Sequence, residues 1–281
     1  MSKLNMPAIV PVAGMNTDFG MEWDASLIPV APNYTALEAT VYECLHAGSI
    51  WIVANDDVAP LLRHRLGEWA TDIDSIQRGT YVRFGTEKHQ EVPIYYVPIH
   101  PRHRGKIDNY AWGAIYGVNV AYWVMTKMGR WSQPHQYYIS FPMGMLDPKE
   151  VLKHRSQIRK NPRLYFSHEG KTVKDGVPLS FVLEPEEWRR AKRKIVTNSA
   201  VWKAPEEGPY PTEKLPPEEQ LISLSYGLAD VFGDGDQAPI QEIESFYDLT
   251  NWAGYVKFIS SELGKKTKRP NTNTMYRGRS K

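Results

Sequence analysis

Several absences narrow what this chain of 281 residues can be. Cys44 is the only cysteine, which excludes an internal disulfide and a zinc site built from several cysteines. No apolar run reaches the length of a membrane span, and the first residues lack the basic stretch and apolar block of a secretory signal. With 42% hydrophobic and 23% charged residues, the composition is that of a globular protein. We therefore expect a soluble, cytoplasmic protein that makes no membrane contact.

A long N-terminal stretch lacks basic residues, and the C-terminal end lacks acidic ones. No lysine or arginine occurs between Lys3 and Arg63, and no acidic residue follows Glu262. The seven basic residues after Glu262 exceed the net charge of +2, so the chain before them is net acidic. We expect residues 263–281 to form a basic, flexible, solvated tail. Contact of this tail with nucleic acid is the alternative, which the near absence of aromatic residues disfavours.

Apolar periodicity predicts strands that alternate with helices. Strands are expected over residues 8–13, 49–54, 91–99 and 136–141. Helices are expected over 34–47, from Asp56 to Leu66, and over 112–128. This alternation predicts an α/β fold in which a mostly parallel sheet is covered by helices on both faces.

The second half of the chain is less regular. Strands over 164–168 and 177–183 flank a turn rich in glycine and aspartate, which predicts a hairpin. A basic helix is expected over 186–196, five prolines mark residues 203–217 as a connector, and a further helix is expected from Pro217 to Val231. We expect one domain over residues 1–262, with the hairpin and the connector inserted around 160–217.

Three segments carry a resemblance to a known family. The chain opens with Ala8-Ile-Val-Pro-Val-Ala-Gly-Met-Asn-Thr17 and continues to Leu27-Ile-Pro-Val30. Sugar-phosphate nucleotidyltransferases (nucleotide-sugar pyrophosphorylases) begin similarly, with a strand, an Ala-Gly-x-Gly-Thr-Arg loop and a Pro-Lys-x-Leu-x-Pro-Val segment. Trp112-Gly-Ala114 is similar to the family's base-contacting segment, and Phe246-Tyr-Asp-Leu-Thr250 to the segment that supplies its second metal-binding aspartate. The resemblance implies a nucleotide-diphospho-sugar transferase-like, Rossmann-like sheet and a role in nucleotide-sugar metabolism.

The resemblance also implies a site. It predicts binding of a nucleoside triphosphate or nucleotide-sugar, with Asp248 as a ligand of Mg²⁺. From the acidic residues themselves we expect Asp18 and Asp24 to complete an oxygen-only metal site with Asp248; carboxylates that cap helices or face water are the alternative. The expected nucleotide-binding residues are Ala13, Gly14, Asn16, Thr17, Trp112 and Gly113.

The chain departs from the family at its charged positions. Asp18 stands where the loop arginine is expected, and Ala25 where the lysine is expected. Residues 140–144 contain no carboxylate where the first metal-binding aspartate is expected. Nucleotidyl transfer requires cations to neutralise the charge that develops on the phosphates. We expect Arg102 and Arg104 to supply it from another loop, with Asp18 as a helper; an exposed basic loop is the alternative.

Three functions follow from these observations. The first is transfer of a nucleotidyl group from a nucleoside triphosphate to a sugar phosphate with Mg²⁺. A metal-dependent glycosyltransferase on the related fold needs no triphosphate clamp and suits the acidic loop better. A catalytically silent binding or structural protein would keep the fold as a scaffold and engage partners through the basic helix over 186–196 or the tail.

Overall fold

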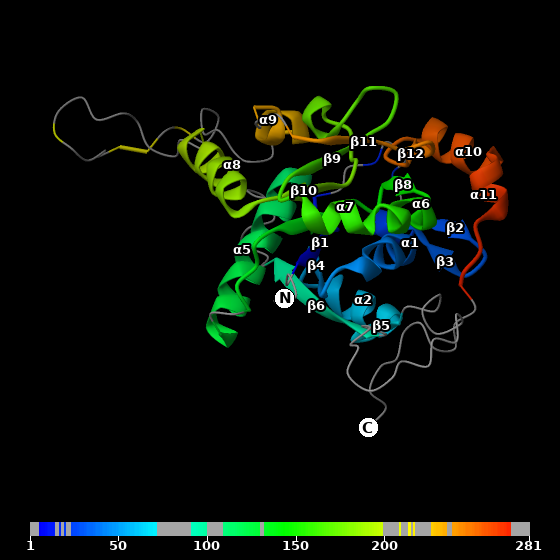
Figure 1. The fold of residues 1–281 in the computed structure, drawn as a ribbon, viewed down its shortest axis with the longest axis horizontal. Coiled ribbons are helices and arrows are strands. Elements are labelled where there is room, and N and C mark those ends of the chain that lie inside the picture. Colours follow the sequence, from blue (N-terminus) through cyan, green and yellow to red (C-terminus); the bar gives the residue numbers. More distant parts are fainter. Residues whose placement is uncertain are drawn as a thin grey trace.

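The computed structural model describes residues 6–14, 17, 20, 24–71, 91–99, 109–129, 132–198, 208, 213, 214, 216, 226–234 and 238–270. Its centre is an eight-stranded sheet (Figure 1). In spatial order the strands are β11 (Ile240–Glu242), β9 (Leu164–Ser167), β10 (Phe181–Leu183), β7 (Tyr137–Ile139), β1 (Pro7–Pro11), β4 (Ser49–Asn55), β6 (Glu91–Ile99) and β5 (Trp69–Thr71).

The sheet is mostly parallel. Strand β1 pairs in parallel with β4 and β7, β4 with β6, and β9 with β11. Strand β10 runs antiparallel to β7 and β9, and β5 runs antiparallel to β6. The α/β class and the predicted hairpin of β9 and β10 are thereby confirmed.

The order of strands reverses beside β1. The chain adds β4 and then β6 on one side of β1, and returns to place β7 on the other side. Such a reversal is a topological switch point, and open α/β sheets bind ligands in the crevice outside the carboxyl ends of their strands at this place. The fold thus directs attention to the residues that follow β1 and β7.

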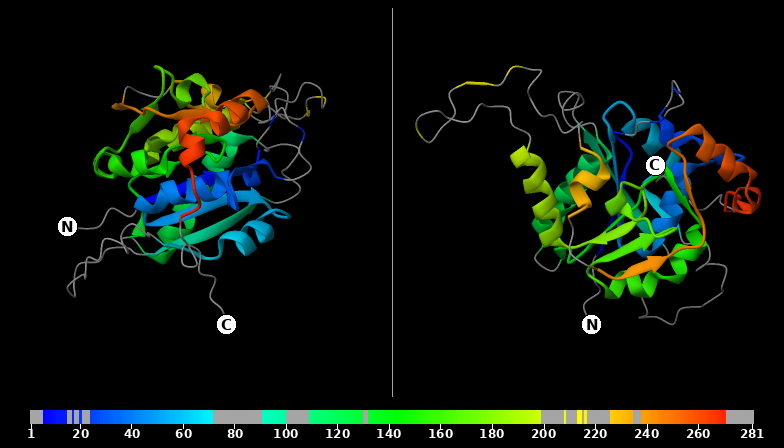
Figure 2. Two further views of the ribbon diagram at one scale, coloured as in Figure 1. Left: turned by 90° about the vertical axis from the view of Figure 1, so that its right-hand side faces the viewer. Right: turned by 90° about the horizontal axis from the view of Figure 1, so that it is seen from above.

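Helices cover both faces of the sheet (Figure 2). Alternate residues of a strand face opposite sides, so Ala8 and Val10 of β1 belong to one core cluster and Ile9 to another. The first cluster packs under α1 (Ala36–Glu43), α2 (Ala59–Leu66), α6 (Pro148–Lys153) and α7 (Arg155–Lys160). The second packs under α5 (Tyr110–Met128), α8 (Pro185–Asn198) and α9 (Leu228–Phe232).

A third cluster of buried residues, including Ile28, Met143, Leu249 and Phe258, lies beside the sheet. It is framed by two short antiparallel ribbons and the last helices. These elements are η1 (Ala25–Leu27), β2 (Pro29–Ala31), β3 (Tyr34–Thr35), β8 (Gly144–Leu146), β12 (Phe246–Asp248), α10 (Trp252–Ser260) and α11 (Glu262–Lys266). The 3₁₀ turns η2 (Cys44–His46) and η4 (Val173–Asp175) also belong to the described part of the chain.

Capping residues explain where two helices differ from the predicted ranges. Helix α1 begins at Ala36 because Thr35 and Glu38 form a capping box, and it passes into η2 at Cys44. Helix α5 begins at Tyr110, before the predicted start, because the Asn109 side chain caps it. Of the helix predicted to start at Pro217, the structure describes α9, and residues 217–225 lie outside the described part of the chain.

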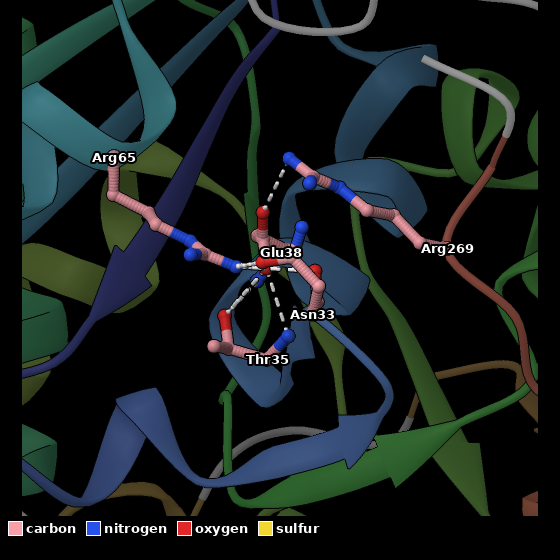
Figure 3. A network of polar contacts seen from close by, with 5 residues as sticks. All are labelled: Asn33, Thr35, Glu38, Arg65 and Arg269. Carbon is pink, nitrogen blue, oxygen red and sulfur yellow. Dashed lines mark hydrogen bonds and ion pairs between the residues drawn. The ribbon is translucent and has the colours of Figure 1, made fainter.

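The C-terminal part of the described chain packs against the body. The predicted start of the tail at residue 263 falls inside α11, and the Arg269 guanidinium lies 3.3 Å from Glu38 Oε1 (Figure 3). Residues 271–281 are not described. Over the described ranges, no helix is both long enough and apolar enough to cross a membrane.

Candidate functional site

A cavity of about 290 Å³ lies at the switch point, where the chain leaves β1. Distant parts of the sequence meet in its wall, namely the turn after β1, the start of α5, the segment before β10, the start of α9 and the end of β12. Among the described residues it is lined by Gly14, Asn109, Tyr110, Gly176, Pro178, Tyr226, Gly227, Leu228, Asp248 and Thr250. The volume is near the lower end of the range for small-molecule sites.

Gly14 allows the turn after β1 to pack closely against the start of α5. Its φ of +81° lies in the left-handed region, and a Cβ there would come within 2.4 Å of the Asn109 backbone nitrogen. A side chain at this position would therefore meet both backbone strain and a backbone clash. The buried Ala13 fixes the same turn, because its N–H donates to the Val53 carbonyl at 3.0 Å.

The start of α5 forms the facing wall. Asn109 Oδ1 accepts hydrogen bonds from the backbone nitrogens of Ala111 and Trp112, at 2.7 and 3.3 Å. Asn109 and Tyr110 line the cavity, whereas Trp112 and Gly113 follow them and do not. Gly113 packs on β1 instead, since a Cβ there would lie 3.2 Å from Pro11 Cβ. Contact of Trp112 and Gly113 with a base stays a prediction.

Asp248 is the one carboxylate on the described wall of the cavity. Its Oδ1 accepts from the backbone nitrogen of Thr250 at 2.9 Å and from the Thr250 hydroxyl at 2.6 Å. Helix α10 packs closely against the backbone of Asp248, because a Cβ on Gly254 would lie 1.8 Å from the Asp248 carbonyl oxygen. The carboxylate is thus held by its Oδ1, and we expect Oδ2 to be the atom that meets a ligand.

Asp24 occupies a different environment. It caps η1, and its Oδ1 accepts from the backbone nitrogen and the hydroxyl of Ser26. Burial raises the pKa of its carboxyl, and the bonds from Ser26 oppose that rise. Burial is the main cause that raises the pKa of the Tyr110 hydroxyl, and the charges of Asp24 and Asp248 add to the rise.

These positions bear on Mg²⁺. The described part of the chain contains no group of three or more His, Cys, Asp or Glu side chains placed to hold a metal. Asp248 suits a magnesium ion that takes its other ligands from water and substrate phosphates. Asp24 is not among the described residues that line the cavity.

The segment after β7 is turned into the core. In this segment the family resemblance would place its first metal-binding aspartate. The Ser140 hydroxyl instead donates to Glu43 Oε1 at 2.9 Å, and Ser140 and Met143 are fully buried. The structure therefore gives this segment a packing role.

The other expected site residues are placed as follows. Thr17 is half-buried and does not line the cavity. Asn16, Asp18, Arg102 and Arg104 lie outside the described residues, and their roles stay predictions.

Sequence reasoning missed several residues of the wall. Asn109 could have been found, because asparagine directly before an apolar helical stretch is a capping signal. Tyr226 and Gly227 fall inside the helix predicted from Pro217 to Val231, and no local pattern marks them as residues of a site.

Comparisons with known proteins give likenesses of backbone alone. No family model and no curated protein matches the chain. The structure of 4-diphosphocytidyl-2C-methyl-D-erythritol synthase from Anaerococcus prevotii aligns with a TM-score of 0.49 at 11% identity, over 90% of this chain and 93% of that one. The structure of Rv0371c from Mycobacterium tuberculosis aligns with a TM-score of 0.45 at 11% identity, over 91% and 98%. These likenesses identify no substrate or activity for this chain.

Proposed function

We propose that the cavity after β1 binds a nucleotide or nucleotide-sugar and that the chain is nucleotidyltransferase-like. One observation carries the proposal. Three features meet around one cavity at the switch point of the sheet: the Gly14 turn, the start of α5 and Asp248. The sequence singles out Gly14 and Asp248 separately, and the start of α5 lies directly before the segment that begins at Trp112. A scaffold without a ligand has no reason to keep this place open.

The proposed reaction is nucleotidyl transfer. An oxygen of the sugar phosphate attacks the α-phosphorus of a nucleoside triphosphate, and the bond to the departing pyrophosphate breaks. Bound Mg²⁺ would neutralise phosphate charge. In this proposal Asp248 holds the ion, Arg102 and Arg104 clamp the phosphates, and Asp18 and Asp24 assist.

A second candidate is a glycosyltransferase that uses a nucleotide-sugar. It is favoured by the composition of the described wall, where Asp248 is the one charged side chain and the polar groups come from Asn109, Tyr110, Tyr226 and Thr250. Such a wall suits the hydroxyls of a ribose or sugar better than a bare triphosphate.

Thermal-shift measurements with the full chain test the proposal. Nucleoside triphosphates and nucleotide-diphospho-sugars are added with and without Mg²⁺. A ligand that binds the native state at a hundred times its Kd stabilises it by about 2.7 kcal/mol, which raises the Tm by several degrees. A magnesium-dependent rise with one triphosphate supports nucleotidyl transfer, and a rise with nucleotide-sugars alone supports the glycosyltransferase. No rise with any of them contradicts the proposal.

A matched pair of variants locates the binding. Asp248→Asn keeps an Oδ1 acceptor for Thr250 and removes the charge. Asp147→Asn is the control, because Asp147 Oδ1 likewise accepts from the backbone nitrogen two residues on, at 2.9 Å, but lies outside the cavity wall. We expect Asp248→Asn to abolish the magnesium-dependent part of the shift and Asp147→Asn to retain it. Equal shifts in both variants would place the ligand elsewhere.

A further inference from the structure

We propose that a surface formed by α5 and α8 binds single-stranded nucleic acid. This basic–aromatic surface consists of Trp123 and Lys127 on α5 and of Arg189, Arg190 and Arg193 on α8. The two helices lie side by side over the same face of the sheet (Figure 1). The inference does not depend on what the cavity binds.

The sequence of α8 separates an apolar face from a basic one. Pro185 at the start and Glu186 and Glu187 in the first turn favour helix formation there. Trp188, Ala191 and Ile195 are buried against the sheet. The intervening residues 189–194 are otherwise all basic, so the cations are placed on the side that faces away from the core.

Two of these cations bond to side chains outside α8, and three more are exposed, of which Arg193 donates from Nε to the Arg189 carbonyl oxygen at 3.4 Å. Lys192 Nζ donates to Asn119 Oδ1 on α5 at 2.8 Å, and Lys194 pairs with Asp234. Arg189, Arg190 and Arg193 are exposed. Helix α8 carries five basic residues against two acidic ones, Glu186 and Glu187, and Asp234, 40 residues further along the chain, pairs with Lys194. The surface therefore keeps an excess of positive charge.

Aromatic rings join the two helices within this surface. The Arg189 guanidinium lies 5.7 Å from the centre of the Tyr122 ring and 5.9 Å from that of Trp188. The Tyr122 ring in turn lies 6.0 Å from the Trp123 ring. The Trp123 side chain is 56% exposed. A guanidinium held over aromatic rings next to an accessible indole can pair with a phosphate while the indole stacks on a base.

Other occupants fit this surface less well. A second copy related by two-fold symmetry would place the same basic helix face against itself, and like charges oppose that. Duplex DNA could satisfy the cations, but its bases are already stacked and would leave the indole unused. The exposed cations of α6 and α7 cover the opposite face of the sheet, where none of the described Trp, Tyr or Phe side chains of the covering helices is exposed. Single-stranded nucleic acid matches both the charge and the aromatic ring.

Fluorescence anisotropy with the full chain tests the proposal. The probe is a fluorescein-labelled oligothymidylate of about 20 nucleotides, titrated over a range of salt concentrations. A double neutralisation, Arg190→Gln with Arg193→Gln, is compared with Lys153→Gln and Lys160→Gln on α6 and α7. If each arginine meets a phosphate, the first pair lowers the slope of log affinity against log salt by about 1.4. The second pair leaves it unchanged.

Trp123→Ala tests the aromatic part. Loss of one stacked base weakens binding of a single strand by about tenfold or more, while Trp123→Phe restores much of it. Duplex of the same length serves as the competitor, and vesicles of phosphatidylserine and phosphatidylcholine serve as a second anionic surface. The proposal is overturned by no binding at low salt, by equal losses in both neutralised pairs, or by binding insensitive to Trp123→Ala. Preferential capture by duplex or by vesicles also overturns it. Because the C-terminal tail is intact in every variant, binding through the tail would appear as insensitivity to all of them.

Discussion

Helix α1 buries two glutamates, five residues apart, and each end of the helix satisfies its carboxylate differently. Glu38 and Glu43 are 0% and 2% exposed. Glu38 meets two guanidiniums, with Arg65 3.0 Å from Oε2 and Arg269 3.3 Å from Oε1 (Figure 3). It also accepts from the backbone nitrogen and the hydroxyl of Thr35, at 2.8 and 3.1 Å.

Glu43 has hydroxyls where Glu38 has cations. Its Oε1 accepts from the hydroxyls of Tyr138, Ser140 and Ser180, the last two at 2.9 and 2.8 Å. Burial raises the pKa of Glu43, and these hydroxyls only partly oppose the rise. One helix therefore accommodates a buried carboxylate in two different ways. At one end the carboxylate is paired with two guanidiniums, and at the other burial favours the neutral acid.

Removing the Glu38 carboxylate should have the largest effect. Glu38→Ala takes away one partner of a buried ion pair and the capping box at the start of α1, and leaves two guanidiniums without their anion. Because these guanidiniums are partly exposed, we expect a loss near the lower end of the usual range, about 3 kcal/mol. Urea unfolding measures this loss.

Glu262→Ala is the matched control. Glu262 also pairs with two cations, Lys265 and Lys266, but on the surface of α11, where it is 74% exposed. We expect it to change stability by less than about 1 kcal/mol. Similar losses in the two variants would contradict the assignment of a structural role to the buried pair.

His46, beside Glu43, should give the second largest effect. Burial is the main cause that lowers its pKa to about 4 from 6.5, although its ring nitrogen Nδ1 lies 2.9 Å from the Glu43 carbonyl oxygen. A folded pKa below the unfolded one means that stability is present above pH 6.5 and is lost as the pH falls toward 4. Between pH 7 and pH 5 this residue should cost about 2 kcal/mol.

Urea unfolding at the two pH values, with His46→Gln, isolates this term. The variant should lose less stability than the wild type on going from pH 7 to pH 5. His135→Gln, at an exposed histidine, is the control and should follow the wild type. An unchanged pH dependence in His46→Gln would show that another group is responsible.

The sequence predicts the elements better than it predicts these contacts. Apolar patterns predict strands β1, β4, β6 and β7 and helices α1, α2 and α5, and their alternation predicts the α/β class. The short strands β2, β3 and β5 are not predicted. The partners of Glu38 lie 27 and 231 residues away, and no local pattern joins them. Glu43 likewise finds its hydroxyls on β7 and before β10, which become its neighbours only when the sheet forms.

The candidate site shows the same division. Gly14 and Asp248 are predicted from motifs, and both line the cavity. The position of Gly14 can be predicted because a tight turn after an apolar strand favours a residue that tolerates positive φ. Tyr226 and Gly227 reach the cavity through the packing of α9, which depends on the whole second half of the fold. Local patterns therefore locate the site but do not complete its wall.

Replacing each buried glutamate by glutamine separates the two environments, and the expected change in stability is smallest at Glu43. Because its folded pKa is raised, Glu43 contributes stability that is present below pH 4.5 and is lost as the pH rises. Glu43→Gln keeps an oxygen acceptor for the three hydroxyls and cannot ionise. We expect it to lie within about 1 kcal/mol of the wild type at pH 5, and to gain on the wild type as the pH rises to 8. Glu38→Gln should instead be less stable at both pH values, because it loses its pairing with Arg65 and Arg269. Urea unfolding of the two variants side by side decides the matter, and a Glu43→Gln variant that loses ground with rising pH would show that Glu43 is buried as a charge.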